Sequence, residues 1–288
     1  MRDSNIGKAA HALLIVGLLG MTGCETIESM TKSKLPTVKA SDAKIAAANF
    51  SAIDFLIDLE IQNPNTFGLA LSGFDYDLQI NNDSFLTGVK SDSLRLEANQ
   101  SSTVAIPMSL PLQELATKIP DILKQDNFDY AFAAQLQFNM PLVGKINVPI
   151  RKTGTLPVIR PPRIKDLKLA KKAINLTGAD LELNLNIENP NNFDLQMKQF
   201  QYSFMGNDQS WASGTTSDPV ALSKKGDASL SIPIRLNFLA IGKTAFQLLT
   251  GGKEFSSKLT GNLTVDSSLK YLPETVVPID FQKSLSLK

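Results

Sequence analysis

The chain repeats itself. When its 288 residues are shifted by 126 positions, residues 49–107 align without a gap on residues 175–233, and about a third of the aligned positions are identical. The triplet Asn63-Pro64-Asn65 falls on Asn189-Pro190-Asn191. A repeat of this length is a domain, because solenoid units have only roughly 20–50 residues. We therefore expect two copies of one folded module.

Strands with one buried face are indicated in both copies. Residues 181–187 place leucine or isoleucine at every second position, with polar residues between them, and the first copy matches with Phe55, Ile57, Leu59 and Ile61. A period of two is typical of a strand that has one dry and one wet face. Each run ends at Asn-Pro-Asn. The residue before a proline favours extended geometry, proline cannot donate to a ladder, and asparagine suits turns, so the triplet predicts the end of a strand.

Further alternating runs predict the remaining strands. They cover 74–80, 104–110, 132–138 and 146–150 in the first copy, and 200–204, 230–236, 259–265 and 276–281 in the second. Apolar residues at steps of three and four predict one late helix per copy, over 112–122 and 238–249, with a kink or break at Pro120. The fold class that we expect is mainly β. It consists of two tandem immunoglobulin- or fibronectin-III-like β-sandwiches of six or seven strands, each with one late helix.

The predicted domain organisation has four parts. Residues 1–23 are a signal peptide, 24–34 a polar tether, 35–157 the first β-sandwich and 158–288 the second. Residues 151–163 contain three prolines, which predict a short and rather stiff connector between the copies.

The first residues have the pattern of an export signal. Arg2 and Lys8 precede a short apolar run that has about half of the ~20 residues a spanning helix needs. Residues 18–24, Leu-Leu-Gly-Met-Thr-Gly-Cys, resemble a bacterial lipoprotein signal. That resemblance implies cleavage before Cys24 and acylation of Cys24, which would anchor the chain in a membrane. An ordinary free or buried cysteine is the alternative. Glu25, rather than aspartate, follows Cys24 and implies the outer membrane of a bacterial envelope, on the side that faces the periplasm.

Composition excludes several classes of function. Residues 1–23 hold two of the 29 Lys and Arg residues and one of the 28 Asp and Glu residues. The mature chain is therefore neutral, and we expect no nucleic-acid partner. The single histidine, His11, lies in the signal, and the single cysteine is the expected lipidation site. Catalysis by Ser-His-Asp or Cys-His and zinc binding are thereby excluded. We expect no enzymatic activity, no catalytic residues, no metal and no cofactor.

Carboxylate pairs are the remaining candidates for chemistry. Asp75 and Asp77 lie on one face of a predicted strand, as do Asp58 and Glu60, and either pair could be an acid/base pair or a calcium site. The second copy has uncharged residues at all four positions, so we favour solvated faces. Residues 223–225, Ser-Lys-Lys, could form a Ser/Lys nucleophile, but we interpret them as a charged loop.

The strand that runs into Asn-Pro-Asn, followed by Phe67 or Phe193 and a second strand, resembles the water-stress and hypersensitive-response (WHy) domain. This domain defines group 2 of the late-embryogenesis-abundant proteins. Residues 59–67 and 185–193 carry the resemblance, which covers both modules. It implies a folded β-sandwich with one helix, an association with desiccation and water stress, and no catalytic residues. The family-motif positions are Asn63, Pro64, Asn65, Asn189, Pro190 and Asn191.

Two functional hypotheses follow. The first is a non-enzymatic, membrane-anchored envelope lipoprotein that contributes to desiccation tolerance through surface contacts of its two modules with membrane or protein clients. The alternative is a periplasmic adaptor or assembly lipoprotein that binds a specific protein through a sheet edge or a groove beside the helix. The Asn-Pro-Asn triplets could offer a polar surface to water or clients. Turn chemistry alone accounts for them, however, so we favour a structural role. The oligomeric state is left open.

Overall fold

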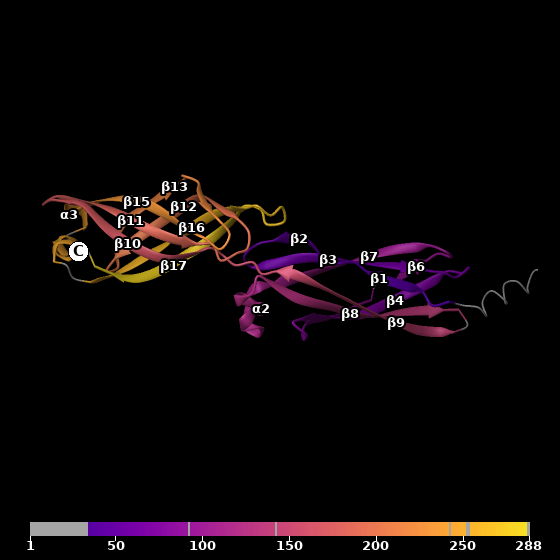
Figure 1. The fold of residues 1–288 in the computed structure, drawn as a ribbon. Helices are drawn as coiled ribbons and strands as arrows, with labels where there is room; N and C mark the ends of the chain where they lie inside the picture. Colours follow the sequence, from indigo (N-terminus) through magenta and orange to yellow (C-terminus); the bar gives the residue numbers. More distant parts are fainter. Residues whose placement is uncertain (1–33, 92, 142, 242, 252–253, 287–288) are drawn as a thin grey trace, which may run out of the picture. The chain divides into compact units, whose positions relative to one another are not determined.

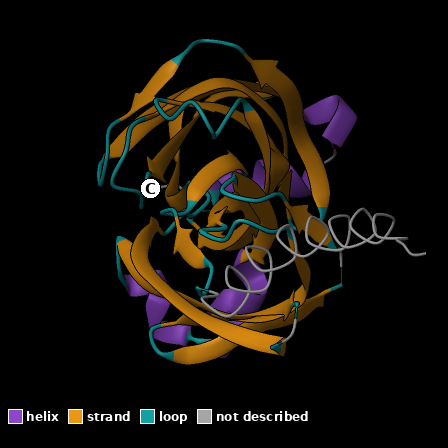
Figure 2. Ribbon diagram, turned by 90° about the vertical axis from the view of Figure 1, so that its right-hand side faces the viewer, coloured by secondary structure: helices purple, strands orange, loops and turns teal. Residues whose placement is uncertain are grey.

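A computed structural model of the protein describes residues 34–286, except 92, 142, 242, 252 and 253. The predicted signal peptide, Cys24 and all of the predicted tether except Lys34 lie outside the described residues. Strands make up most of the ribbon, and the helices are few and short (Figure 2). All strand pairings with a described register are antiparallel. The predicted fold class, mainly β in two β-sandwich-like halves, is confirmed.

The strands of the two repeats follow the same order along the chain (Figure 1), and those that precede the helices correspond at the same shift of 126 residues. Those of the first repeat are β1 (Thr37–Ala40), β2 (Lys44–Ala48), β3 (Ala52–Gln62), β4 (Leu69–Ile80), β5 (Asp83–Lys90), β6 (Leu94–Leu96), β7 (Ser101–Pro111), β8 (Asn127–Met140) and β9 (Gly144–Pro157). Those of the second are β10 (Arg163–Ile174), β11 (Gly178–Glu188), β12 (Leu195–Gly206), β13 (Gln209–Thr216), β14 (Val220–Leu222), β15 (Asp227–Asn237), β16 (Phe255–Ser267) and β17 (Thr275–Leu285).

Each repeat contributes one sheet of three strand positions and one of four. In the second repeat the sheets run β10-β11-β15 and β13-β12-β16-β17, and β14 continues the β13 ladder along β12. In the first repeat β1 and β2 pair with the two ends of β3, where the second repeat has the single strand β10. Among the described residues, each repeat therefore has seven strand positions, within the predicted six or seven.

The helices follow β7 and β15. In the first repeat α2 (Leu112–Lys118) is followed by the 3₁₀ helix η1 (Pro120–Lys124), so the predicted break at Pro120 is confirmed. In the second repeat α3 (Phe238–Ile241) and α4 (Lys243–Thr250) replace the single predicted helix. No helix within the described residues is both long and apolar enough to cross a bilayer.

The sequence patterns did not reveal every strand. The strands that we did not predict are β1, β2, β5, β6, β10, β13 and β14. In β13 Trp211 is the one large apolar residue and the one buried residue, so the apolar alternation in the sequence that reveals a strand is nearly absent. The predicted connector 151–163 was wrong in extent, because β9 continues to Pro157. Only residues 158–162 join β9 to β10, and Val158 and Ile159 are buried rather than solvated.

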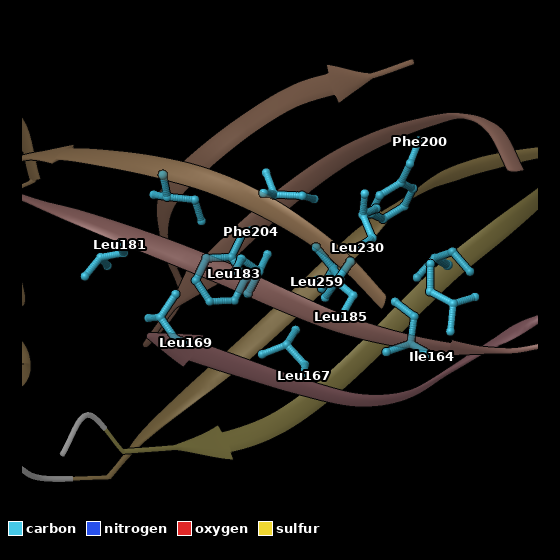
Figure 3. Packing of buried hydrophobic residues seen from close by; sticks show 14 of the residues in the cluster. Ile164, Leu167, Leu169, Leu181, Leu183, Leu185, Phe200, Phe204, Leu230 and Leu259 are labelled. Carbon is cyan, nitrogen blue, oxygen red and sulfur yellow. The ribbon is translucent and has the colours of Figure 1, made fainter. Parts of the chain in front are cut away.

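The core of the second repeat lies between its two sheets. Figure 3 shows the inward side chains of both sheets filling this space, among them Leu181, Leu183 and Leu185 of β11, Phe200 and Phe204 of β12, Leu230 of β15 and Leu259 of β16. They occupy alternate positions of their strands, as the sequence pattern predicts. Burial of these apolar side chains is the main favourable contribution to the folding of the second repeat.

Two-residue hairpin turns join β4 to β5 and β12 to β13. Asn81 and Asn82 both have positive φ, as do Asn207 and Asp208. Positive φ at both central residues is the type I′ geometry that matches the twist of paired strands, and asparagine and aspartate tolerate it better than other non-glycine residues.

The chain divides into two compact units, and these do not coincide with the repeats. Among the described residues, unit 1 holds 34–42, 57–106 and 130–154. Unit 2 holds 43–56, 107–129 and 155–286. Unit 2 thus contains the second repeat and, from the first repeat, the turn before β3 and the helices after β7. The domain boundary at 157/158 stays a prediction.

An ion pair joins the edges of the two sheets in the second repeat. The Lys283 ammonium, on β17, donates to the Asp166 carboxylate, on β10, and lies 3.3 Å from the carbonyl oxygen of Leu167. The Lys283 ammonium holds the pKa of the Asp166 carboxyl below its ordinary value. The pair therefore fastens β10 to β17 only while Asp166 is ionised.

This pair predicts a pH dependence of stability. A carboxyl whose pKa is lowered by folding stabilises the protein above the unfolded-state pKa of about 4, and that contribution is lost as the pH falls below it. Between pH 5 and pH 3, wild-type protein should lose more thermal stability than Lys283→Met. The melting temperatures of both proteins across this range measure the difference. Lys270→Met, at an exposed lysine between β16 and β17, is the control and should follow wild type. Parallel profiles for wild type and Lys283→Met would contradict the assignment.

Candidate functional site

The residues that the sequence singles out most strongly, the two Asn-Pro-Asn triplets, form a buried hydrogen-bond network. In the second repeat the Asn189 side chain is completely buried. Its amide nitrogen donates to the carbonyl oxygens of Phe193 at 2.8 Å, Leu222 at 2.9 Å and Ser223 at 3.3 Å. Its amide oxygen accepts from the backbone and side-chain nitrogens of Asn191, at 3.1 and 3.0 Å.

Asn191 extends the network to the chain segment before β10. Its side-chain nitrogen donates to the carbonyl oxygen of Arg160 at 2.7 Å, and its side-chain oxygen accepts from the Arg160 backbone N–H at 2.8 Å. The Asn191 side chain therefore pairs with the peptide groups of Arg160 as a second backbone strand would. Asn191 is also completely buried.

The first repeat reproduces this network contact by contact. Asn63 donates to Phe67, Leu96 and Glu97, and Asn65 exchanges the same two hydrogen bonds with Lys34, at 2.7 and 2.8 Å. Lys34 precedes Arg160 by 126 residues, so even the partner outside the triplet is at the repeat position. The last residue of the predicted tether is thus held by the fold.

The network joins segments from both sheets. In the second repeat Asn189 directly follows β11 and Arg160 leads into β10, whereas Phe193 leads into β12 and Leu222 ends β14. The first pair of strands belongs to one sheet and the second pair to the other. Buried amides that are fully hydrogen-bonded hold such a joint firmly, because each unpaired polar group would cost about 1–3 kcal/mol.

Burial decides between the two interpretations of the triplets. The asparagine side chains are at most 4% exposed in the first repeat and completely buried in the second. They therefore offer no polar surface to water or to clients, and the structural interpretation holds. The bonds of these asparagines to nearby backbone were predictable from the sequence, whereas their partners 31–34 residues away were not.

Charged side chains surround the triplet of the second repeat. The Lys225 ammonium donates to the carbonyl oxygen of Pro190 at 3.0 Å and to the Asp126 carboxylate. The Arg160 guanidinium donates to the carbonyl oxygens of Pro190 and Gln125. Hydrogen bonding from Lys225 holds the pKa of Asp126 below its ordinary value. Nothing in the sequence pattern marks these three charged residues as neighbours.

The carboxylate pairs lie on solvated strand faces, as expected. Asp75 is exposed, and Asp77 accepts hydrogen bonds from Gln79 and Ser84, both at 2.7 Å. Glu60 is exposed, and the Asp58 backbone is bonded to Ser41. Within the part of the chain that the structure describes, no three His, Cys, Asp or Glu side chains group closely enough to hold a metal ion.

A hollow of about 610 Å³ in unit 1 lies beside the first of these pairs. Asp75, Tyr76 and Asp77 of β4 line it, together with residues 87–89 of β5, 133–135 of β8 and Ile150 of β9. The Tyr76 ring crosses over Gly88, where an added Cβ would lie 2.4 Å from the ring. Asp75, Asp77 and the hydroxyls of Tyr76 and Thr87 are the groups of its lining that acid–base or nucleophilic chemistry could use, and the lining contains no lysine, histidine or cysteine.

A protein-family comparison matches both repeats. The model of the family described as "Late embryogenesis abundant protein" (LEA_2) matches residues 58–154 and 184–273, which is more than half of the chain. Each matched segment includes one Asn-Pro-Asn triplet.

Curated relatives match one repeat's length of the chain. The late embryogenesis abundant protein Lea14-A of Gossypium hirsutum is 19% identical over 141 residues, 49% of this chain and 91% of that protein. The desiccation protectant protein Lea14 homolog of Glycine max is 20% identical over 140 residues, 49% of this chain and 90% of that protein. The solution structure of AT1g01470 from Arabidopsis thaliana is 16% identical, with a TM-score of 0.34, and the match covers 45% of this chain and 85% of that one.

The network predicts that Asn189→Asp destabilises the second repeat strongly. Aspartate has the shape of asparagine but presents acceptor oxygens where three carbonyl oxygens need a donor. With each unsatisfied buried group costing about 1–3 kcal/mol, we expect a total loss of roughly 3 kcal/mol or more. Urea unfolding followed by Trp211 fluorescence measures it, because Trp211 is buried in the second repeat.

The matched control is Asn192→Asp, one residue beyond the triplet at an exposed position. It makes the same chemical change without touching the network, so it should stay within about 0.5 kcal/mol of wild type. Equal unfolding midpoints for Asn189→Asp and Asn192→Asp would contradict the role of the network.

Proposed function

Because the chain belongs to the late embryogenesis abundant protein family, we propose that it is a non-enzymatic envelope lipoprotein that contributes to tolerance of desiccation and related water stress. The observation that carries the proposal is the match of the family model to both repeats. The name of the Glycine max relative, desiccation protectant protein, indicates desiccation as the stress concerned. Within the family, the strand and Asn-Pro-Asn pattern supports assignment of both repeats to the WHy type.

The proposed mechanism is weak and distributed contact between the outer strand faces and membrane or protein clients. On the β10-β11-β15 sheet, the outward face carries closely mixed charges and amides. Lys172 pairs with Glu182 at 3.0 Å, and Lys165 pairs with Asp227 at 2.9 Å. A rigid face with alternating signs can meet many partners through several weak contacts. It holds no large field of one sign that would select a single class of partner.

We place the protein at the outer membrane of a bacterial envelope, held by acyl chains on Cys24 and facing the periplasm. The support is the signal-like sequence 1–23 and its cysteine. Burial of acyl chains contributes ~0.8 kcal/mol per methylene, so several chains on one residue make a durable anchor. The anchor would keep both repeats at the membrane surface, where drying brings membranes and proteins into contact.

The anchor is tested with Cys24→Ser. Without the thiol no acyl chain can be attached there, so the protein should move from the membrane pellet to the soluble fraction of the envelope. Fractionation and immunoblotting measure the shift, and Asn192→Asp, with Cys24 intact, serves as the matched variant. Continued sedimentation of Cys24→Ser with membranes would contradict the lipoprotein assignment.

Protection is tested directly by drying. A soluble chain that begins at residue 25 should preserve a desiccation-sensitive enzyme better than albumin at equal mass. Asn189→Asp, with its disrupted second repeat, should protect less than Asn192→Asp. Recovered enzyme activity after rehydration is the readout.

Two outcomes would contradict the proposal. One is protection no better than albumin. The other is a pulldown from detergent-solubilised envelope that returns one stoichiometric protein partner, which is the result expected of an adaptor.

A further inference from the structure

Each repeat has a turn before its central strand that we call the tip: residues 49–52 before β3, and 175–178 before β11. In the first tip the Asn49 side-chain oxygen accepts from the backbone N–H groups of Ser51 at 2.7 Å and Ala52 at 2.9 Å. In the second, the Asn175 oxygen accepts from Thr177 and Gly178, both at 2.9 Å. The two tips are therefore built alike.

The helices after β7 and β15 are joined to the tips in the same way. The backbone N–H of Leu112 donates to the carbonyl oxygen of Ser51 at 2.8 Å, and that of Phe238 donates to Thr177 at 3.0 Å. An apolar residue occupies the corner of each tip, Phe50 in the first and Leu176 in the second. The contact that the first tip makes therefore indicates what kind of surface the second tip can bind.

The first tip is covered, within unit 2, by the second repeat. Phe50 is partly buried and packs against the core cluster of that repeat. Phe50 and Leu112 line a hollow of about 580 Å³ together with Pro161 and Pro190, so the tip faces the second Asn-Pro-Asn triplet. Just before the tip, the backbone N–H of Ala48 donates to the carbonyl oxygen of Tyr271 at 2.6 Å.

The second tip is uncovered. Leu176 is 87% exposed and Leu239 is 86% exposed, the two largest values among the large apolar residues that the structure describes. Leu176 lies in the tip, and Leu239 lies in α3, whose first residue bonds to the tip; Leu239 and residues 177–180 line a hollow of about 310 Å³. Exposed leucines in and beside one turn are typical of an interaction surface.

The surface that receives the first tip has its own counterpart in the first repeat. Pro190 corresponds to Pro64, and the surrounding asparagine network is the same. Pro161 corresponds to Leu35, which is 66% exposed. An apolar residue thus stands uncovered where the second repeat contacts a tip.

We propose that the tip of the second repeat docks onto the Asn-Pro-Asn end of the first repeat of a second copy of this chain. The contact would repeat between molecules the one that Phe50 makes within unit 2, with Leu176 and Leu239 against Leu35 and Pro64. A contact between two different surfaces leaves one of each free on every pair. It therefore extends into an open chain unless its geometry closes a ring.

The charges of the residues at this contact determine how it responds to salt. Lys225, which pairs with Asp126 in the internal contact, corresponds to Asn99, which carries no charge. The contact between copies therefore lacks a counterpart of the Lys225–Asp126 ion pair, and added salt should weaken it less than it weakens association through the mixed charges of the outer strand faces.

Cysteine cross-linking in the full chain, in the cell envelope, tests the proposal. Leu35→Cys and Leu176→Cys are placed in one chain, at positions exposed enough to leave the fold unchanged, and a short bismaleimide is added. We expect a ladder of dimers and higher species on a denaturing gel. The chain with Val89→Cys in place of Leu176→Cys is the control, since Val89 is 73% exposed but lies on β5 and belongs to neither surface.

Single substitutions establish the orientation. When Leu35→Cys and Leu176→Cys are carried by two differently tagged copies in one cell, only the mixed dimer should form. Three outcomes would overturn the proposal. They are cross-linking no stronger than in the Val89→Cys control, dimers between two Leu176→Cys copies, and capture of a different protein by Leu176→Cys.

A charge introduced at the contact provides an independent test of the docking. Leu239→Asp, added to the doubly substituted chain, buries an unpaired carboxylate when copies associate. It should reduce the cross-linked fraction roughly tenfold or more. A ladder that persists at full strength with Leu239→Asp would contradict docking at the second tip.

Discussion

The asparagine network is the interaction on which each repeat depends. A β-sandwich must hold two sheets in register at the ends of its strands, where ladder hydrogen bonds run out. Asn189 and Asn191 supply this joint with side-chain amides that replace missing backbone partners, and Asn63 and Asn65 do so in the first repeat. The proline between them fixes the direction in which the chain leaves the strand. Four segments meet at the joint, so its loss would free both sheets at once.

Local physics made much of the fold predictable from the sequence. Alternation along 55–61 and 181–187 predicts a half-buried strand, and the structure has it in both repeats. Pro120 predicts a broken helix, because the break rests on backbone geometry alone. The family resemblance was also accessible, since it lies in residues adjacent in sequence.

What could not be predicted depends on neighbours distant in sequence. Asn189 bonds Leu222 and Asn191 bonds Arg160, each across more than thirty positions, and no local sequence pattern identifies these partners. Edge strands such as β13 were missed because a strand with one large apolar side chain lacks the periodic signal. Residues 151–157 fell within the predicted connector 151–163 with its three prolines, yet pairing with β8 makes them strand.

The buried joints contain only neutral amides and peptide groups. Their strength therefore does not depend on any proton or counterion. When a compartment loses water its solutes are concentrated, and at molar salt the reach of a surface charge shrinks to about 3 Å. The ion pairs on the strand faces weaken under such conditions, whereas the hydrogen bonds of Asn63 and Asn189 are buried away from the concentrated salt solution. The modules are thus fastened by the class of polar contact that is least sensitive to the chemistry of drying.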